Sequence, residues 1–446
     1  MQEVERDRMN SRSLRGLLYL ICCMSVVFIF IVHIDYIPNR VTVFNNLRKF
    51  RFTSTSSTEP KQPEERAWFL TNGTRWPEPA TVDSVTGRRV AKLWPHEDTT
   101  SDRVVEQLMF RPPDTGRELP MKLVYFSGYI EWEVNHPKGS SEPFVTCPVN
   151  RCVGTTDASR SLEADAILMK NSFHNPGHHK PAKQLWIMYR LESPVNSEFL
   201  LQQNVYNWTA TYMRSSDISR PYFKWIYYDE TSKEWPGPPR DFAAGKTKKV
   251  AWFVTNCYAR NNRLQYAREL GKHIQVDMYG SCGAEFKCPR SREDGCFKLL
   301  EEEYKFYLAF ENSNCREYIT EKFFKNSLRH KVIPVVMGAP REDYELVAPK
   351  DSFIHVEDFD SPKQLAEYLH KVDQDDDLFN SYFKWRDMGE IIEGYFYCRL
   401  CAMLHDDYPE KYYKKIDDFW RKPGSCIKNK TWKEYRKSVG GKLPEI

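Results

Sequence analysis

Apolar runs and amphipathic runs alternate along the second half of the chain, beginning at Lys248. The runs KKVAWFVTNC, IQVDMYG, YKFYLAFENS, VIPVVMG and SFIHVEDF have the length and composition of buried strands, and helical patterns such as RNNRLQYARELGKH and TEKFFKNSLRH lie between them. Strands that alternate with helices predict a parallel sheet covered on both faces. The sequence therefore predicts an α/β fold for this half.

Three further strand candidates, LVYFSGY, ADAILMKN and QLWIMYRLES, come earlier and predict a first α/β unit that begins near Pro120. Two Rossmann-like units in sequence bind ligands between the carboxyl ends of their strands. A late helix is predicted to begin at Ser361, because Ser361 suits the N-cap, Pro362 the first helical position and Gln364 the third.

The balance of charge argues against a nucleic-acid-binding protein. The 446 residues include 65 basic and 61 acidic side chains, a formal net charge of +4, whereas a clustered basic excess is expected of such a protein. Apolar residues make up 41% of the chain and charged residues 28%, which is typical of a globular enzyme with two or three domains.

An uncharged apolar run, LLYLICCMSVVFIFIVHI, spans Leu17 to Ile34. Its length is near the minimum for a transmembrane helix, ~17–20 residues, and the four arginines before it predict a cytosolic N-terminus. A cleaved signal peptide is the alternative, but no small-x-small cleavage site follows the run. We therefore expect a cytosolic tail at 1–16, an uncleaved anchor at 17–34 and a single-pass type II topology.

The region after the anchor, residues 35–119, is predicted to be a stem, because FTSTSSTEPKQPEE is rich in Ser, Thr and Pro and has little to bury. Three N-glycosylation sequons begin at Asn72, Asn207 and Asn429. Ten of the 12 cysteines lie outside the apolar run, an even number that is compatible with disulfides. Together these features predict a lumenal body.

The stretch FYLAFENSNCREYITEK, from Phe306 to Lys322, is the most informative one for function. Its apolar start predicts a buried strand that ends in the polar turn 311–314. Thr320 is a candidate N-cap for the following helical pattern, and the amides of a helix start beside Tyr318 and Lys322 suit an anion such as a diphosphate. On its pattern alone, an ordinary strand–turn–helix unit without a ligand is the better interpretation.

This stretch resembles the signature of the α1,3-fucosyltransferases, which transfer fucose from GDP-fucose to a hydroxyl of N-acetylglucosamine (GlcNAc). The resemblance extends over roughly Met121 to Cys401 and is carried further by TCPVNRCVGTTDASRSLEADAILM, YRLESP, TYMRSSDI and VIPVVMGAPREDYELVAPKDSFIHVEDFDSPKQLAEYL. It implies the GT-B architecture, in which two Rossmann-like domains face a cleft. The acceptor-side domain is expected at 120–245, the GDP-fucose-binding domain at 246–390, and a C-terminal segment that packs back across both at 391–446.

The resemblance also implies the chemistry. GDP-fucose is β-linked and the product α-linked, so the reaction inverts, and a single general base suffices. Glu192, in YRLESP, matches the family's base; without the resemblance, a surface glutamate in a loop is the better interpretation. The positions that match the family's donor-binding residues are Arg263, Tyr307, Asn312, Tyr318, Glu321 and Lys322.

Within that set, Arg263 and Lys322 are expected to hold the two phosphates, and Glu321 is expected to bind hydroxyls of ribose or fucose. Arg214 and Asp217, in TYMRSSDI, also match a family motif. They either line the cleft or fix a loop by an ion pair.

The motif Cys398-Arg-Leu-Cys401 by itself fits a redox pair or half of a zinc site. The resemblance implies instead two disulfides, Cys147–Cys398 and Cys152–Cys401. The pairing of the remaining six cysteines is not readable from the sequence: Cys257, Cys282, Cys288, Cys296, Cys315 and Cys426.

Two clusters of possible metal ligands are interpreted otherwise. The acidic run 373–377 follows a helix and is interpreted as a solvated cap, and His174, His178 and His179 as a loop on the acceptor side of the cleft. The resemblance implies that no metal or other cofactor is essential, although Mg²⁺ or Mn²⁺ stimulates some members of the family.

Within the family, CREYITEKFFKNSL, VMGAPREDYE, YFKWRDMGE and YCRLCAMLH are most similar to the invertebrate core α1,3-fucosyltransferases. This implies a Golgi enzyme with a lumenal catalytic domain that fucosylates the Asn-linked GlcNAc of N-glycans. The alternatives are a Lewis-type or LacdiNAc enzyme acting on outer GlcNAc, or an inactive glycan-binding relative, against which the intact Glu192, Arg263 and Lys322 argue. The expected partners are GDP-fucose, glycoprotein N-glycans and the membrane; the oligomeric state stays open, with a homodimer as one alternative.

Overall fold

The computed structural model describes strands at 74–75, 81–82 and 89–90 and residues 102–113, 115–128, 142–227, 235–283, 293–428 and 430–444. All of them belong to one compact unit, residues 66–446. Within these described residues, no helix combines the length and the apolar character needed to cross a bilayer. The predicted anchor, most of the predicted stem and the sequons at Asn72 and Asn429 lie outside the described residues.

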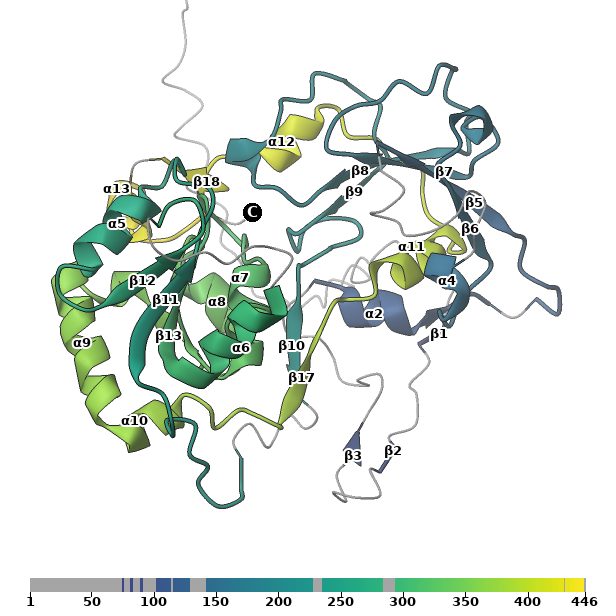
Figure 1. Ribbon diagram of the computed structural model, residues 1–446. Helices are drawn as coiled ribbons and strands as arrows, with labels where there is room; N and C mark the ends of the chain where they lie inside the picture. Colours follow the sequence, from purple (N-terminus) through teal and green to yellow (C-terminus); the bar gives the residue numbers. More distant parts are fainter. Residues whose placement is uncertain are drawn as a thin grey trace, which may run out of the picture. The chain divides into compact units, whose positions relative to one another are not determined.

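A five-stranded parallel sheet in the order β6-β5-β7-β8-β9 forms the first half of this unit (Figure 1). Its strands are β5 (Lys122–Ser127), β6 (Cys152–Thr155), β7 (Ala166–Lys170), β8 (Leu185–Arg190) and β9 (Trp208–Thr211). All residues of β8 and β9 are buried, as expected of strands covered on both faces. The three strands predicted for this half are β5, β7 and β8. The sequence analysis did not find β6 and β9, which have only four residues each.

A second five-stranded parallel sheet, in the order β12-β11-β13-β15-β16, follows in the chain (Figure 1). Its strands are β11 (Lys248–Phe253), β12 (Val276–Tyr279), β13 (Tyr304–Phe310), β15 (Ile333–Met337) and β16 (Ile354–His355). All five coincide with predicted strands, and the prediction of an α/β fold with parallel sheets is confirmed.

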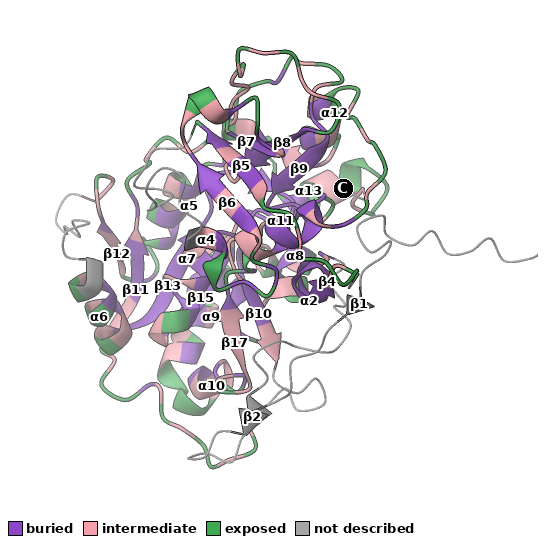
Figure 2. Ribbon diagram, turned by 90° about the vertical axis from the view of Figure 1, so that its right-hand side faces the viewer, coloured by how far each residue is buried: buried purple, intermediate pink, exposed green. Residues whose placement is uncertain are grey.

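Helices cover both faces of the second sheet. On one face, α5 (Arg263–Leu270) and α9 (Pro362–Gln374) pack against alternate strand residues such as Phe306 and Leu308. On the other face, α6 (Glu293–Glu303), α7 (Glu321–Phe324) and α8 (Arg341–Val347) pack against the residues between them, such as Tyr307. This alternation follows from the two-residue period of a strand. Figure 2 shows that the strands of both sheets are largely buried, whereas exposed residues gather on loops and outer helices.

One helix start is predicted correctly and one is not. Ser361 accepts a hydrogen bond from the backbone N–H of Gln364 and begins α9, with Pro362 in its first turn. The predicted helix TEKFFKNSLRH is instead split into the four-residue α7 and the 3₁₀ helix η5 (Leu328–His330). Thr320 does not cap α7 with its side chain, because its hydroxyl bonds the Glu311 carboxylate.

The C-terminal segment contacts both halves. Strand β17 (Gly389–Ile392) pairs with β10 (Lys224–Tyr227), and α11 (Phe396–Leu404) then joins the core of the first sheet. Helix α12 (Ile416–Trp420) also packs on the first half, whereas β18 (Cys426–Ile427) and α13 (Trp432–Ser438) return to the second.

Four disulfides between described cysteines fasten this arrangement. Cys147–Cys398 and Cys152–Cys401 hold α11 to the first half, and these are the two pairings that the family resemblance implied. Cys315–Cys426 joins β18 to β14 (Asn314–Cys315), and Cys257–Cys282 pins the loop after β11. The remaining elements are β1 (Thr74–Arg75), β2 (Thr81–Val82), β3 (Arg89–Val90), α2 (Val104–Met109), β4 (Phe110–Arg111), α4 (Glu142–Val145), η2 (Ala158–Arg160), η3 (Pro194–Asn196), η6 (Val356–Asp358) and α10 (Asp376–Ser381).

Candidate active site

The carboxylate of Glu192 joins the two halves of the unit. Glu192 follows the carboxyl end of β8 in the first half, and its Oε1 accepts hydrogen bonds from the Tyr318 hydroxyl at 2.9 Å and the Asn312 amide nitrogen at 3.2 Å. Both donors follow β13 in the second half. Burial raises the pKa of Tyr318 well above its ordinary value, so Tyr318 keeps its proton and donates it. The three predicted site residues therefore lie together, although more than a hundred positions separate Glu192 from the other two.

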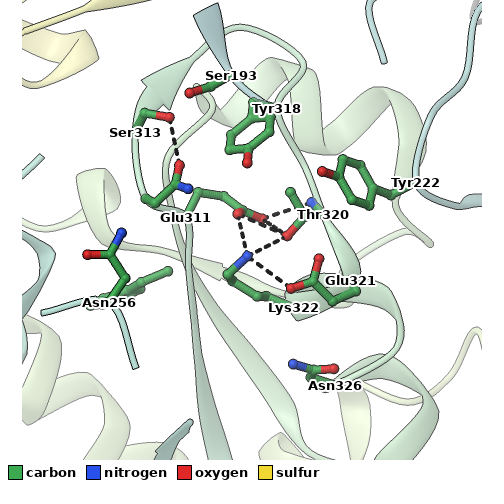
Figure 3. Close-up of polar contacts among 12 residues, drawn as sticks. Ser193, Tyr222, Asn256, Glu311, Ser313, Tyr318, Thr320, Glu321, Lys322 and Asn326 are labelled. Atoms are coloured by element: carbon green, nitrogen blue, oxygen red, sulfur yellow. Dashed lines mark hydrogen bonds and ion pairs between the residues drawn. The ribbon is translucent and has the colours of Figure 1, made fainter. Parts of the chain in front are cut away.

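The amino group of Lys322 lies between two carboxylates (Figure 3). Its Nζ is 3.1 Å from Glu311 Oε2 and 3.1 Å from Glu321 Oε1, and it also donates to the Thr320 hydroxyl at 2.8 Å. Glu311 is fully buried, and its Oε1 accepts both the backbone N–H and the hydroxyl of Thr320. This cluster forms a connected network at the carboxyl end of β13.

The charges of this network follow from burial and from Lys322. Burial raises the pKa of Glu311. Burial also acts to raise the pKa of Glu321, but the adjacent Lys322 ammonium outweighs it, so the net shift is downward and Glu321 is ionised. For Lys322, burial acts to lower the pKa, but Glu311 and Glu321 outweigh it and raise the pKa. Lys322 is therefore a permanent cation at neutral pH.

Arg263 and Tyr307, both predicted to bind the donor, are buried. Arg263 is buried at the start of α5, and its guanidinium donates to the Phe310 carbonyl at 2.6 Å and to the Asn256 carbonyl at 3.1 Å. It thereby ties the carboxyl end of β13 to the loop after β11. Tyr307 lies within the packing of the second sheet, where its hydroxyl accepts a bond from Asn326 at 3.4 Å and burial raises its pKa to about 12.

Arg214 and Asp217 fix loops by ion pairs. Arg214 Nε is 2.5 Å from Glu317 Oε1, which links the first half to the second. The buried carboxylate of Asp217 accepts the backbone N–H of Thr209 and pairs with Lys411 of the C-terminal segment. Of the two roles that the sequence left open, the structure supports the loop-fixing one.

Sequence reasoning missed several members of this site. Glu311, Thr320 and Asn326 all contact predicted residues, and Tyr222 donates to the carbonyl of Leu191, next to Glu192. A signal was present for Glu311, because a carboxylate directly after the apolar run Phe306–Phe310 of β13 is unusual. Tyr222 gave no comparable signal, because it lies in a loop nearly a hundred residues from Tyr318.

With this geometry described, comparison with known proteins identifies the family. Residues 120–223 match the family described as "Fucosyltransferase, N-terminal", and residues 243–420 match "Glycosyltransferase family 10 (fucosyltransferase) C-term". The chain belongs to glycosyltransferase family 10, the fucosyltransferases. It is 46% identical over 389 residues to glycoprotein 3-alpha-L-fucosyltransferase A of Drosophila melanogaster, which covers 84% of this chain and 76% of the relative.

Other members are less similar. The human 4-galactosyl-N-acetylglucosaminide 3-alpha-L-fucosyltransferase FUT5 is 38% identical over 271 residues, covering 57% of this chain and 69% of the relative. A crystal structure of an alpha1,3-fucosyltransferase with GDP-fucose is 14% identical, with a TM-score of 0.46, and covers 71% of this chain and 99% of that one.

In the described part of this family 10 chain, few side chains that could bind a metal ion lie close together. Its one group of closely spaced ligand-type side chains is Cys152, Cys401 and His405, and the two cysteines are joined in a disulfide. In the acidic run, Asp375 caps α10 and Asp373 pairs with Lys305. Asp375 therefore fits the predicted cap, whereas Asp373, with only 9% of its side chain exposed, is paired with lysines and not solvated as predicted.

One predicted modification site of the family 10 chain, Asn207, is buried and hydrogen-bonded. Asn207 is only 4% exposed, its amide nitrogen donates to the Lys411 carbonyl at 2.9 Å, and its oxygen accepts from the Trp186 N–H at 2.9 Å and from Lys180. These contacts argue against a glycan on Asn207, and glycosylation there stays a prediction of the sequon.

Proposed function

We propose that the chain transfers fucose from GDP-fucose, in α1,3 linkage, to the Asn-linked GlcNAc of N-glycans. The observation that carries this proposal is the 46% identity with the Drosophila glycoprotein 3-alpha-L-fucosyltransferase A over 84% of the chain. The contact of Glu192 with Asn312 and Tyr318 supports it, because it brings a carboxylate from one half against polar residues of the other.

Glu192 is the general base of the proposed reaction. The donor is β-linked and the product α-linked, so one displacement at the anomeric carbon suffices. The Glu192 carboxylate takes the proton of the acceptor hydroxyl, the hydroxyl oxygen forms the new bond to that carbon, and the bond to the diphosphate oxygen breaks. Glu192 is half-buried, and its Oε1 already accepts hydrogen bonds from Asn312, Tyr318 and the Ser193 N–H, which orient the carboxylate.

Lys322 stabilises the departing diphosphate. The transition state resembles an oxocarbenium ion, and the charge that develops on the leaving oxygen needs fixed positive charge rather than an acid. Lys322 is a cation at neutral pH held by Glu311 and Glu321. Glu321 is less buried than Glu311, with 43% of its side chain exposed, so it is the partner that is free to turn toward sugar hydroxyls.

Purified chain, GDP-fucose and a defined N-glycopeptide test this proposal. The expected product carries one fucose on the Asn-linked GlcNAc, at the 3-position by linkage mapping. Glu192→Gln is expected to abolish transfer and to keep GDP-fucose binding. A Glu192→Gln variant that still turns over would remove Glu192 from the role of base.

A second candidate is transfer to outer GlcNAc residues of glycan antennae. It is favoured by the 38% identity with the human 4-galactosyl-N-acetylglucosaminide 3-alpha-L-fucosyltransferase FUT5, although that match covers only 57% of this chain. Fucose found solely on the antennae of the same glycopeptide would establish this second candidate in place of the first.

The cellular setting is also a proposal: a single-pass type II protein of the Golgi, anchored by residues 17–34, with a GT-B catalytic body in the lumen. The apolar run with arginines before it supports the anchor, and the disulfides support an oxidising compartment. The body should be protected from added protease in sealed Golgi vesicles. Digestion without detergent would contradict the topology.

A further inference from the structure

Three large apolar side chains stand out from the surface, on the loop that contains Glu192 and on a second loop that contacts it. Among the described residues, the most exposed large apolar side chains are those of Tyr258, at 94%, Leu201, at 83%, and Phe199, at 70%. Single exposed apolar residues are ordinary on protein surfaces. These three come from only two loops, and we call them the rim.

Each of the two loops follows the carboxyl end of a strand, one strand in each sheet. The first loop, residues 191–204, follows β8 and contains Glu192; the second, residues 254–262, follows β11 and leads into α5. They touch where the guanidinium of Arg260 donates to the Val195 carbonyl at 3.5 Å. An acceptor whose reactive hydroxyl lies at Glu192 must extend its remaining sugars over the surface next to it.

The backbone that carries Tyr258 is fixed, although its ring is in solvent. Cys257, next to it, is bonded to Cys282. The N–H of Tyr258 donates to the Asn256 side chain at 3.1 Å, and the buried Arg263 holds the Asn256 carbonyl. Asn256 is among the residues drawn around Lys322 in Figure 3. Because the backbone of this loop is already ordered, little backbone conformational entropy is lost when a ligand covers the Tyr258 ring.

Phe199 is held in a similar way. The guanidinium of Arg421 lies 3.9 Å from the centre of the Phe199 ring and also donates to the Ser197 carbonyl at 2.7 Å. The preceding turn is bonded to the site itself, since the Ser197 hydroxyl donates to the carbonyls of Glu192 and Ser193. The exposed ring is thus connected to the segment that carries the base.

We propose that the rim binds the sugar rings of the acceptor that lie beyond the GlcNAc receiving fucose, with Tyr258 stacking on the apolar face of a pyranose. This rests on the proposed function. An uncharged oligosaccharide is recognised by apolar ring faces and hydrogen bonds, and tyrosine offers both an apolar body and a polar tip. The rim then adds affinity for a larger acceptor through contacts remote from the reacting atoms.

Two acceptors separate this role from a structural one. Tyr258→Ala is assayed with a glycopeptide that carries the branched N-glycan core and with an asparagine that carries only the two innermost GlcNAc residues. We expect kcat/KM to fall about three- to tenfold for the larger acceptor and to be unchanged for the smaller one, with the KM for GDP-fucose unchanged for both. Tyr258→Phe should keep most of the wild-type value.

Leu162→Ala is the matched control. Leu162 is also exposed, at 59%, but it lies in the turn before β7, at the amino ends of the strands, and its replacement should affect neither acceptor. An equal loss for both acceptors in Tyr258→Ala, or no loss, would overturn the proposal. A loss with the glycopeptide but not with the same free glycan would assign the rim to the peptide and also overturn it. Failure of the wild-type chain to fucosylate any N-glycan would instead count against the proposed function.

Discussion

Glu311 is a fully buried carboxylate whose cost is offset by three neighbouring groups. Lys322 pairs with one of its oxygens, and the backbone and hydroxyl of Thr320 donate to the other. A buried charge of this kind is rarely favourable by itself, and breaking the pair is more costly than replacing both partners. Glu311 therefore serves to hold Lys322 in place, and the energy of the fold and the position of the cation depend on the same contact.

Replacing Lys322 separates these two effects. Lys322→Ala should raise the KM for GDP-fucose, lower turnover, and reduce the free energy of unfolding by about 3–5 kcal/mol, because Glu311 loses its cation. The double variant Glu311→Gln with Lys322→Met should regain much of the stability but not the donor affinity. Denaturant unfolding and donor titration measure the two quantities. An unchanged donor KM in folded Lys322→Ala would contradict the phosphate role.

Asn207 gives a second prediction at this scale. Its amide nitrogen donates to the Lys411 carbonyl and its amide oxygen accepts from the Trp186 N–H, so peptide mapping of the purified protein should find Asn207 without a glycan. Asn207→Ala should lower the free energy of unfolding by about 1–3 kcal/mol, because the Trp186 N–H and the Lys411 carbonyl lose their buried partner. A glycan detected on Asn207 in active, folded enzyme would show that this loop differs from the structure.

At the scale of elements, α11 is the clearest case of a helix far in sequence from the sheet that it covers. It follows the whole second sheet, yet it packs in the core of the first and carries both Cys398 and Cys401. The two bridges span 251 and 249 residues, so either one alone closes nearly the same loop. Their contributions to stability should therefore be strongly non-additive.

Serine variants test this. Removing Cys147–Cys398 or Cys152–Cys401 singly should change the free energy of unfolding little, whereas removing both should cost about 5 kcal/mol on the chain-entropy account. Removing Cys257–Cys282, which spans 25 residues, should cost about 2 kcal/mol less than the double removal. Thermal unfolding measures all four variants, and equal, additive losses from the two single removals would contradict the shared-loop explanation.

At the scale of the whole molecule, the C-terminal segment belongs to both halves. Trp420 is buried on the first half, and Trp432 is buried on the second, where its indole donates to the Gly338 carbonyl. Truncation after Leu404 should therefore expose apolar surface on both sheets and give an aggregated, inactive product. A chain that begins at residue 66 keeps the entire compact unit and should retain transfer. Size-exclusion chromatography and a fucose-transfer assay compare the two, and a soluble, active product from the first truncation would contradict this description.

Local patterns were sufficient for the second sheet and for three strands of the first, and they were insufficient for the site. Buried runs such as β13 are long enough to predict, while the four-residue β6 and β9 are not. The predicted helix from Thr320 is cut short because Glu311 takes the side chain that would have capped it. The bond between Glu192 and Tyr318 spans 126 positions, and no spacing rule predicts it; only the family resemblance brought the two together beforehand.

The path of the last segment also sets when the protein can fold. During synthesis, N-terminal domains generally fold first, as soon as their residues have left the ribosome. Here the first sheet lacks α11 until residue 404 has emerged, and the second lacks β18 and α13 until close to the end of the chain. The core of the first half cannot be completed before α11 emerges, whereas the core clusters of the second sheet are built from residues no later than Ile391. The late cysteines Cys398 and Cys401 must also reach partners made some 250 residues earlier, so the first half, although it is synthesised first, is expected to complete its core last.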